Sequence, residues 1–306
     1  MSTPVVPADP AAPPAPEAPE APGAPGTPAA PARGRGMRGL SPSRAADFLQ
    51  CPLLYRFRTI DRLPEAASEA AARGTLVHAV LERVFDLPAP ERTAEAACAM
   101  LEGQWEALGE RDARVRTLFG EDEAGRAALE KWLRGARALL RRWFELEDPT
   151  RLEPAEREAW VQVRLPDGPL LRGVVDRLDV APSGELRVVD YKTGRAPSAA
   201  FEAAALFQLR FYALVLWRLR GVVPRRLQLV YLGSGEVLGH EPDEDELLAT
   251  ERKVRALWAA IERNRAAGEW PAKPGRGCSW CEHKALCPAF GGTPPPLPAE
   301  GGGAPA

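Results

Sequence analysis

The chain has 306 residues, with 40 Lys and Arg against 42 Asp and Glu and a formal net charge of −2. It is not an overall polycation, so any surface that binds nucleic acid must be local. Its apolar runs, such as YALVLW at 212–217, fall far short of the ~20 residues that cross a bilayer, so we expect a cytoplasmic protein without a membrane partner. Five cysteines without a secretion signal indicate reduced thiols rather than a disulfide scaffold.

Both ends of the chain have the composition of tails. Residues 1–38 carry Pro at about every third position, which favours polyproline II or disorder over a packed core. Residues 291–306 are similarly rich in Pro and Gly. We therefore expect one globular region at 39–290.

Helical signals fill the first part of this region, at about 41–150. Ser41 can cap a helix whose first residue is Pro42, and apolar residues follow at helical spacing. Three more segments are rich in Ala and Leu, and the first of them is expected to break near Gly74. These segments lie at 65–86, 91–109 and 122–147.

Strand signals follow and predict an α/β core at about 155–268. Three segments alternate or are β-branched, and the turns PDGP and APSGE separate them, which predicts an antiparallel meander. A helix, strands around a Gly-Ser-Gly turn and a long helix come next. The meander segments are EAWVQVRL, LLRGVVDRLDV and ELRVVDYKTG, and the later elements lie near 200–219, 226–240 and 243–267.

The third meander segment ends in an aspartate and a lysine two residues apart. Successive side chains on a strand point to opposite faces, so Asp190 and Lys192 share one face and Tyr191 takes the other. Lysine supplies only five of the 40 basic residues, which favours a specific need for it here. The alternative is a solvated strand end with one weak ion pair.

Asp176, on the preceding strand, can approach Asp190 if the APSGE turn joins the two strands. Converging carboxylates repel each other unless a cation lies between them. Two such ligands for Mg²⁺ or Mn²⁺, with Lys192 to stabilise developing charge, meet the needs of metal-assisted phosphodiester hydrolysis.

Two helical segments offer further polar side chains. His78 shares a helical face with Glu82, although a lone helical histidine is more often a core residue than a metal ligand. Gln208 and Tyr212 are four residues apart and would project together from the helix after Lys192, and without context they are an ordinary amphipathic pair.

The order GxxxH, GVVDRLD, VVDYKTG and QxxxY resembles the RecB-type branch of the PD-(D/E)xK nuclease superfamily over about residues 41–290. This branch includes the nuclease domains of recombination helicase-nucleases and the CRISPR adaptation nucleases. The resemblance implies a restriction-endonuclease-like α/β core, with a central mixed sheet flanked by helices, after a helical N-terminal subdomain.

The resemblance also implies roles for the site residues. Lys192 would be the catalytic lysine. Asp179 has no metal role in the pattern, so we expect it at the surface or beside the metal ligands. Glu158, at the start of the first meander segment, is a further candidate for a place beside them. The implied metal ligands are His78, Asp176, Asp190 and the Tyr191 backbone carbonyl, and the implied residues of the DNA-facing side are Gln208 and Tyr212.

Four of the five cysteines have a spacing that suggests one shared site. Cys278, Cys281 and Cys287 form a C-x₂-C-x₅-C group, and Cys51 is the distant fourth candidate. By the same resemblance these four would hold a structural [4Fe–4S] cluster that closes the domain. A structural zinc site completed by His283 is the alternative. Cys98, in the helical AEAACAML, is expected to be a core residue.

We therefore expect a metal-dependent DNA exonuclease that acts on single-stranded or unwound ends in DNA repair or recombination. The sequence contains no Walker GxxxxGK[ST] motif, so any helicase would be a separate partner. The alternative is a non-catalytic DNA-binding module that keeps a structural zinc or iron–sulfur site.

Overall fold

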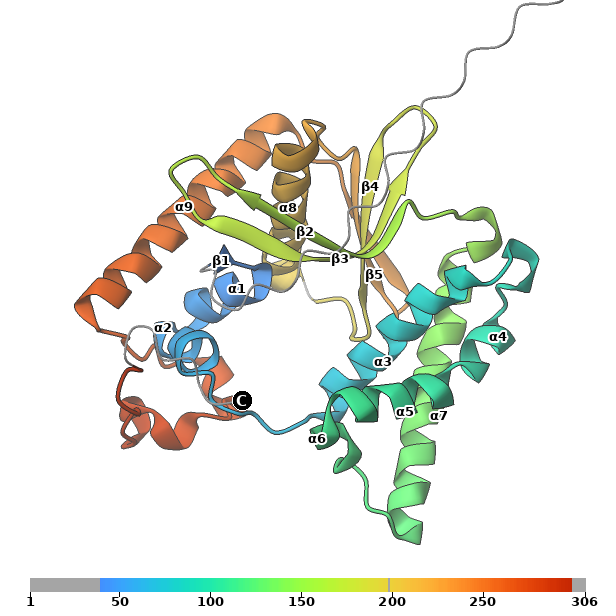
Figure 1. Cartoon of the computed structure of the whole chain (residues 1–306), viewed down its shortest axis with the longest axis horizontal. Coiled ribbons are helices and arrows are strands. Elements are labelled where there is room, and N and C mark those ends of the chain that lie inside the picture. Colours follow the sequence, from blue (N-terminus) through green and yellow to red (C-terminus); the bar gives the residue numbers. More distant parts are fainter. Residues whose placement is uncertain (1–38, 198, 299–306) are drawn as a thin grey trace, which may run out of the picture. The chain divides into compact units, whose positions relative to one another are not determined.

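The computed structural model describes residues 39–197 and 199–298 (Figure 1). The predicted tail at 1–38 and residues 299–306 of the C-terminal tail lie outside these described residues. Residues 291–298 are described, and Arg56 donates a hydrogen bond to the carbonyl of Pro295 in this segment. None of the described helices is both long and apolar enough to cross a membrane.

The helices and strands follow the order that the sequence patterns predict, with added short elements. The helices are α1 Pro42–Gln50, α2 Pro52–Tyr55, α3 Glu69–Arg83, α4 Ala94–Ala99, α5 Leu101–Arg111, α6 Ala113–Arg116, α7 Glu123–Leu146, α8 Ala199–Arg220 and α9 Glu244–Ala267. The strands are β1 Gly39–Leu40, β2 Glu156–Arg164, β3 Leu170–Val180, β4 Leu186–Lys192, β5 Arg226–Tyr231 and β6 Glu236–His240. A π-helix at Arg56–Asp61 follows α2.

Local capping explains where the helices begin. Ser41 accepts a hydrogen bond from the N–H of Arg44 at 3.3 Å, so α1 starts as predicted. The predicted break near Gly74 is wrong, because α3 runs through it without interruption. The single helix predicted at 91–109 is also wrong: Thr93 caps a helix that starts at Ala94, and a tight turn at Met100 separates α4 from α5.

The strands form one mixed sheet in the order β1-β3-β4-β5-β6, with β2 paired to the other edge of β3. The meander β2-β3-β4 is antiparallel, as predicted. Helix α8 then crosses over, so β5 lies parallel to β4, and β6 returns antiparallel to β5. The predicted fold class is therefore confirmed: a central mixed sheet with helices on both faces (Figure 1).

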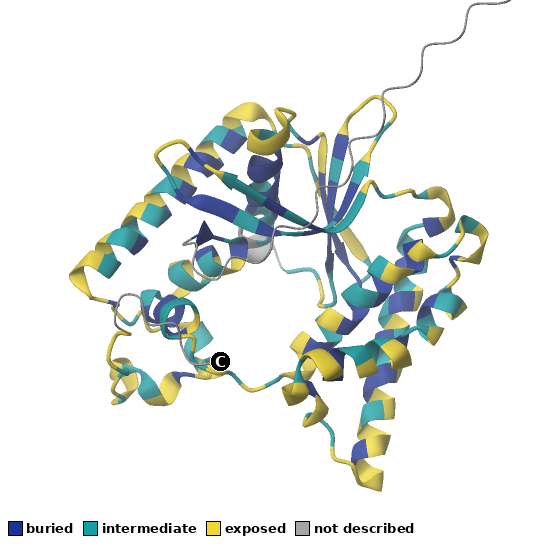
Figure 2. Cartoon of the chain, in the orientation of Figure 1, coloured by how far each residue is buried: buried dark blue, intermediate teal, exposed yellow. Residues whose placement is uncertain are grey.

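The sheet separates two hydrophobic cores. Helices α8 and α9 cover one face, whereas α3 and α7 cover the other, and the residues buried between the layers are dark blue in Figure 2. The first core includes Val161, Val175, Val188, Leu229, Phe211 and Leu257. The second core includes Leu76, Trp143, Val189, Tyr191 and Val230. Because β4 contributes alternate residues to the two cores, both its faces are fixed by packing.

Strand β3 is shared between two neighbours along one edge. It pairs with β1 only at Leu170 and Leu171, and with β4 only from Arg177 to Val180. Between these two ladders, residues 172–176 have no strand partner on that edge among the described residues. Asp176 lies at the point where the sheet forks.

The loop after β4 is fixed against the β5–β6 turn. The N–H of Gly233 donates to the carbonyl of Gly194 at 3.0 Å, and the N–H of Leu232 donates to that of Lys192 at 2.8 Å. These contacts hold the end of β4, which carries Lys192.

We predict that Gly233→Ala lowers the free energy of unfolding by about 1–3 kcal/mol, because its Cβ would meet the Gly194 backbone at 2.5 Å. Gly103→Ala in α5 is the matched control, since no atom lies within 4 Å of the added Cβ. It should stabilise the protein by about 0.5–1 kcal/mol through helix propensity. Urea denaturation of both variants checks this, and equal stabilities would contradict the close approach.

Candidate active site

Three side chains from distant parts of the sequence meet at the fork of the sheet. His78 on α3, Glu158 on β2 and Asp176 on β3 each offer a ligand atom, and these atoms lie within 4.8 Å of one another. Nδ1 of His78 lies 3.4 Å from Asp176 Oδ2 and 3.9 Å from Glu158 Oε1. Among the described residues this is the one such group of His, Cys, Asp or Glu. Nitrogen and carboxylate donors of this kind suit a divalent metal ion.

Asp190 belongs to a second group, beside the first. The side chain of Asp190 is 4% exposed, and its Oδ2 lies 2.6 Å from Nζ of Lys192. Gln208 on α8 closes the group: its Nε2 donates to Asp190 Oδ1 at 2.8 Å, and its Oε1 accepts from Lys192 Nζ at 2.9 Å. Asp190 and Lys192 thus share the α8 face of β4, as strand alternation predicts.

The backbone of Tyr191 joins the two groups. Its N–H donates to Oδ2 of Asp176 at 2.7 Å, and its carbonyl oxygen lies 3.0 Å from Nε2 of His78. A histidine that donates one ring N–H to a backbone carbonyl is held with its other nitrogen free to bind a metal. The Tyr191 carbonyl therefore orients His78 here, and its role as a direct metal ligand stays a prediction.

Tyr212 supports the site from inside the first core. It is 7% exposed, and its Cε1 lies 2.5 Å from the place where a side chain on Gly173 of β3 would begin. The glycine thus leaves room for the ring beside β3. So little of Tyr212 is exposed that we expect it to hold α8 and Gln208 in place. Its place on the DNA-facing side, which the resemblance implies, stays a prediction.

Glu158 occupies a strained position. Its φ is +43°, in the left-handed region that costs a non-glycine residue on the order of 1 kcal/mol. It lies opposite Asp176, between the Arg157–Arg177 and Ala159–Val175 pairs of the β2–β3 ladder.

The alternation of faces shifts at the same point. Val175 lies in the first core, whereas Arg177, two residues on, contacts Glu147 at the end of α7. The distortion turns the carboxylates of Glu158 and Asp176 toward His78.

Sequence reasoning placed Glu158 beside the metal ligands and not among them. The turn residues could have indicated the position of Glu158. The PDGP turn pairs Arg164 with Leu170, and counting away from the turn along both strands puts Glu158 opposite Asp176. The positive φ that aims the side chain had no sequence signal.

The electrostatics of the site favour a bound cation. Burial raises the pKa of Glu158 to about 7 and that of Asp190 to about 6, and in both cases the charge of Asp176 adds to the shift. Burial alone would lower the pKa of His78, but its hydrogen bond to Asp176 and the surrounding carboxylates raise it to about 9. Without a metal ion the site therefore takes up protons near neutral pH, because the carboxylates repel one another.

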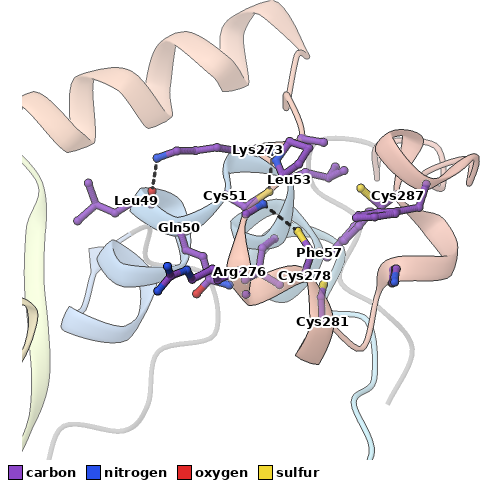
Figure 3. A pocket seen from close by; sticks show the side chains of 17 residues that line it. Leu49, Gln50, Cys51, Leu53, Phe57, Lys273, Arg276, Cys278, Cys281 and Cys287 are labelled. Carbon is purple, nitrogen blue, oxygen red and sulfur yellow. Dashed lines mark hydrogen bonds between the residues drawn. The ribbon is translucent and has the colours of Figure 1, made fainter. Parts of the chain in front are cut away.

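The four predicted cysteines line one cavity of about 250 Å³ (Figure 3). Cys51 lies between α1 and α2, and the other three follow α9. Two sulfurs accept backbone hydrogen bonds, Cys51 from Lys273 at 3.4 Å and Cys278 from Gly275 at 3.3 Å. The remaining sulfurs of the cavity are those of Cys281 and Cys287.

Neither Cys98 nor His283 lines this cavity. Cys98 is partly buried against the second core, where its Sγ contacts the carbonyl of Arg137. His283 is 4% exposed; its ring packs edge-on against Phe57, and its Nε2 lies 3.0 Å from Glu65.

The fold and both groups of side chains agree with the protein family that the sequence matches. Residues 39–288 match the PD-(D/E)XK nuclease superfamily, and the chain belongs to this superfamily. Its members are nucleases that use divalent metal ions such as Mg²⁺ or Mn²⁺.

Two similar proteins extend over most of the chain. The Gene 69 protein of Mycobacterium phage D29 is 26% identical over an alignment of 277 residues, and the match covers 82% of this chain and 96% of that protein. A solved structure of a candidate exonuclease from Eubacterium rectale has a TM-score of 0.54 at 14% identity, covering 80% of this chain and 88% of that one. The second likeness shows a shared fold.

We predict that Mn²⁺ binding releases protons and weakens as the pH falls from about 8 to about 6, because bound metal must displace the protons that the raised pKa values of Glu158 and His78 retain. Calorimetry at about pH 7 in two buffers of different ionisation enthalpy measures the release. Asp176→Ala should remove the Mn²⁺ signal. An affinity that does not change with pH would contradict this electrostatic account.

Proposed function

We propose that this protein is a RecB-type, metal-dependent DNA exonuclease that acts on single-stranded or unwound ends in DNA repair or recombination. The observation that carries the proposal is the meeting of two groups at the Tyr191 backbone. One group offers metal ligands, and the other holds Lys192 against Asp190. We further propose that it works in the cytoplasm, beside a separate helicase.

The metal site fits the residues around it. Oδ2 of Asp190 is buried without a well-angled hydrogen bond among the described residues, although Lys192 Nζ is near, so this oxygen has capacity for a cation. The proposed ligands are His78, Asp176, Asp190 and the Tyr191 carbonyl, to which the geometry adds Glu158. A bound Mg²⁺ or Mn²⁺ would supply Lewis acidity toward the scissile phosphate and the attacking water.

The protein's own residues place positive charge beside that metal. The Lys192 side chain is 31% exposed, so its ammonium can reach a phosphate while Asp190 and Gln208 hold it in place. Preorganised charge of this kind stabilises a transition state more than a mobile side chain would. A DNA-binding module has no need to combine such a lysine with a metal site, which disfavours the non-catalytic alternative.

We predict that Lys192→Ala and Asp190→Ala each lower the rate of DNA cleavage by at least about 10²–10³-fold, while folding and DNA binding persist. Lys192→Arg should fail nearly as badly, because a planar guanidinium does not replace a compact ammonium. Lys131→Ala, at an exposed position on α7, is the matched control. The assay compares single-stranded and duplex ends in Mg²⁺, Mn²⁺, Ca²⁺ and EDTA.

Three outcomes of this assay would count against the proposal. Full activity in EDTA would exclude the metal mechanism, and near wild-type cleavage by Lys192→Ala would exclude the assigned lysine. DNA binding without cleavage in Mg²⁺ or Mn²⁺ would favour the non-catalytic module. We expect Ca²⁺ to bind without supporting turnover, because it is larger and less demanding in geometry.

We also propose that Cys51, Cys278, Cys281 and Cys287 hold a structural [4Fe–4S] cluster. Four cysteine thiolates are the usual ligands of such a cluster, and the cavity that these cysteines line, about 250 Å³, is larger than a single ion needs. The pairing of His283 with Glu65 also disfavours zinc completed by that histidine.

We predict that protein purified without oxygen is brown and contains about four irons per chain. Cys51→Ser should lose the colour and some stability, because the cluster joins α1 and the C-terminal segment only in the folded state. Cys98→Ser is the control and should keep the colour. Colourless protein with one zinc would support the alternative. Colour lost in Cys98→Ser but kept in Cys51→Ser would overturn the ligand assignment.

A further inference from the structure

A fully buried ion pair lies behind the catalytic strand, on the face opposite Lys192. The Arg177 side chain is 1% exposed, and its two terminal nitrogens donate to the Glu147 carboxylate at 2.9 and 2.7 Å. Its Nε lies 3.1 Å from Asp179. Trp143 completes the group, since its Nε1 donates to Glu147 at 2.7 Å.

This pair holds the side chain of Tyr191. Arg177 donates a hydrogen bond to the Tyr191 hydroxyl, and its guanidinium lies over the ring, 5.6 Å from the centroid. The edge of Trp143 packs against the same ring at 6.2 Å. The Tyr191 side chain is therefore held by two residues, Arg177 and Trp143.

The backbone of the same tyrosine is what links the two halves of the site. Its N–H fixes Asp176, and its carbonyl fixes the ring of His78. A rotation or slide of Tyr191 would change both contacts at once. The contacts on the side chain thus act on the metal ligands through this peptide unit, and also through the Tyr191 ring, which packs edge-on against the ring of His78 at 6.2 Å.

Stability alone does not account for this arrangement. Taking a guanidinium and a carboxylate out of water costs much of what their attraction returns, and apolar residues often serve a core as well. Burial would raise the pKa of Glu147, but Arg177 lowers it, so the pair is ionic. Such a pair does supply fixed geometry, because the two donors of arginine match the two oxygens of a carboxylate.

We propose, on the basis of the metal site proposed above, that Arg177 is a positioning residue. It clamps the Tyr191 side chain from behind the sheet and so fixes the backbone N–H and carbonyl on which that site depends. Partners that orient a metal ligand typically change metal affinity about 10- to 100-fold when they are altered.

The test measures Mn²⁺ affinity by calorimetry, below the unfolding temperature of each variant. Arg177→Lys keeps the charge and loses the paired donors, and Tyr191→Phe removes the hydroxyl that Arg177 holds. We expect the affinity to fall about 10- to 100-fold in Arg177→Lys and by a smaller factor in Tyr191→Phe. Cleavage should recover toward the wild-type maximal rate at saturating Mn²⁺, since Lys192 is untouched.

Arg92→Lys is the matched control. Arg92 is 5% exposed, pairs with Glu153 at 2.9 Å and lies over the ring of Phe85 at 5.3 Å, but it contacts none of the site residues among its described partners. It should lose stability, as Arg177→Lys does, and keep the wild-type Mn²⁺ affinity.

The outcomes separate the clamp from the proposed function. If the wild-type protein binds no Mn²⁺, the metal site and the clamp both fail. If it binds Mn²⁺ and Asp176→Ala does not, but Arg177→Lys and Tyr191→Phe bind as tightly as wild type, only the clamp fails. An equal loss of Mn²⁺ affinity in Arg92→Lys would show that lowered stability alone weakens binding, and this result would also overturn the clamp. If Arg177→Lys does not fold, Tyr191→Phe decides alone.

Discussion

The register between β3 and β4 is the constraint on which the site depends. Pairing Arg177 with Val189 puts Asp176 next to Asp190 at the fork of the sheet, and puts Arg177 behind the strand with Tyr191. A slip of one residue would turn every side chain of β4 to its other face. The Asp190 carboxylate would then enter the second core, and Tyr191 would face α8. Packing on both faces of β4, with the Gly194–Gly233 contact at its end, excludes that slip.

The crowded carboxyl groups of this site destabilise the metal-free fold at neutral pH. Asp190 and Glu158 have folded pKa values above their unfolded ones, so the folded protein holds their protons more tightly, and stability falls as the pH rises through about 4 to 7. The raised pKa of His78 acts in the same direction, since its contribution is complete below about 6.5 and is lost as the pH rises through about 9. A metal ion would relieve the repulsion between the carboxylates, whereas it would displace the proton with which His78 stabilises the metal-free fold. The carboxylates are therefore arranged better for a cation than for an empty site, and the left-handed φ of Glu158 adds to that cost.

Local sequence patterns predicted the elements that depend on local chemistry. The meander, the crossover helix and the shared face of Asp190 and Lys192 all follow from turn residues and strand alternation. Strand β1 could not be predicted, because two residues form it only by pairing with Leu170 and Leu171 far along the chain. The burial of Tyr212 depends on the missing side chain of Gly173, and the place of His283 depends on Glu65. The Tyr212–Gly173 and His283–Glu65 contacts join segments far apart in the chain, and the hydrophobic periodicity of a sequence does not predict such contacts.

The cavity lined by Cys51 and the C-terminal cysteines has a consequence for the order of synthesis. Cys278 leaves the ribosome 227 residues (278 − 51) after Cys51, which at 5–20 residues per second is a delay of about 10–45 s. During that time α1 and α2 lack the segment that carries Cys278, Cys281 and Cys287, and the thiol of Cys51 is not yet enclosed. Strand β1 also lacks its pairing partner at first, since Leu170 is made about 130 residues after Gly39. Helices α1 and α2 are thus made early and enclosed late, because the cavity that Cys51 lines is complete only after Cys287 has been made.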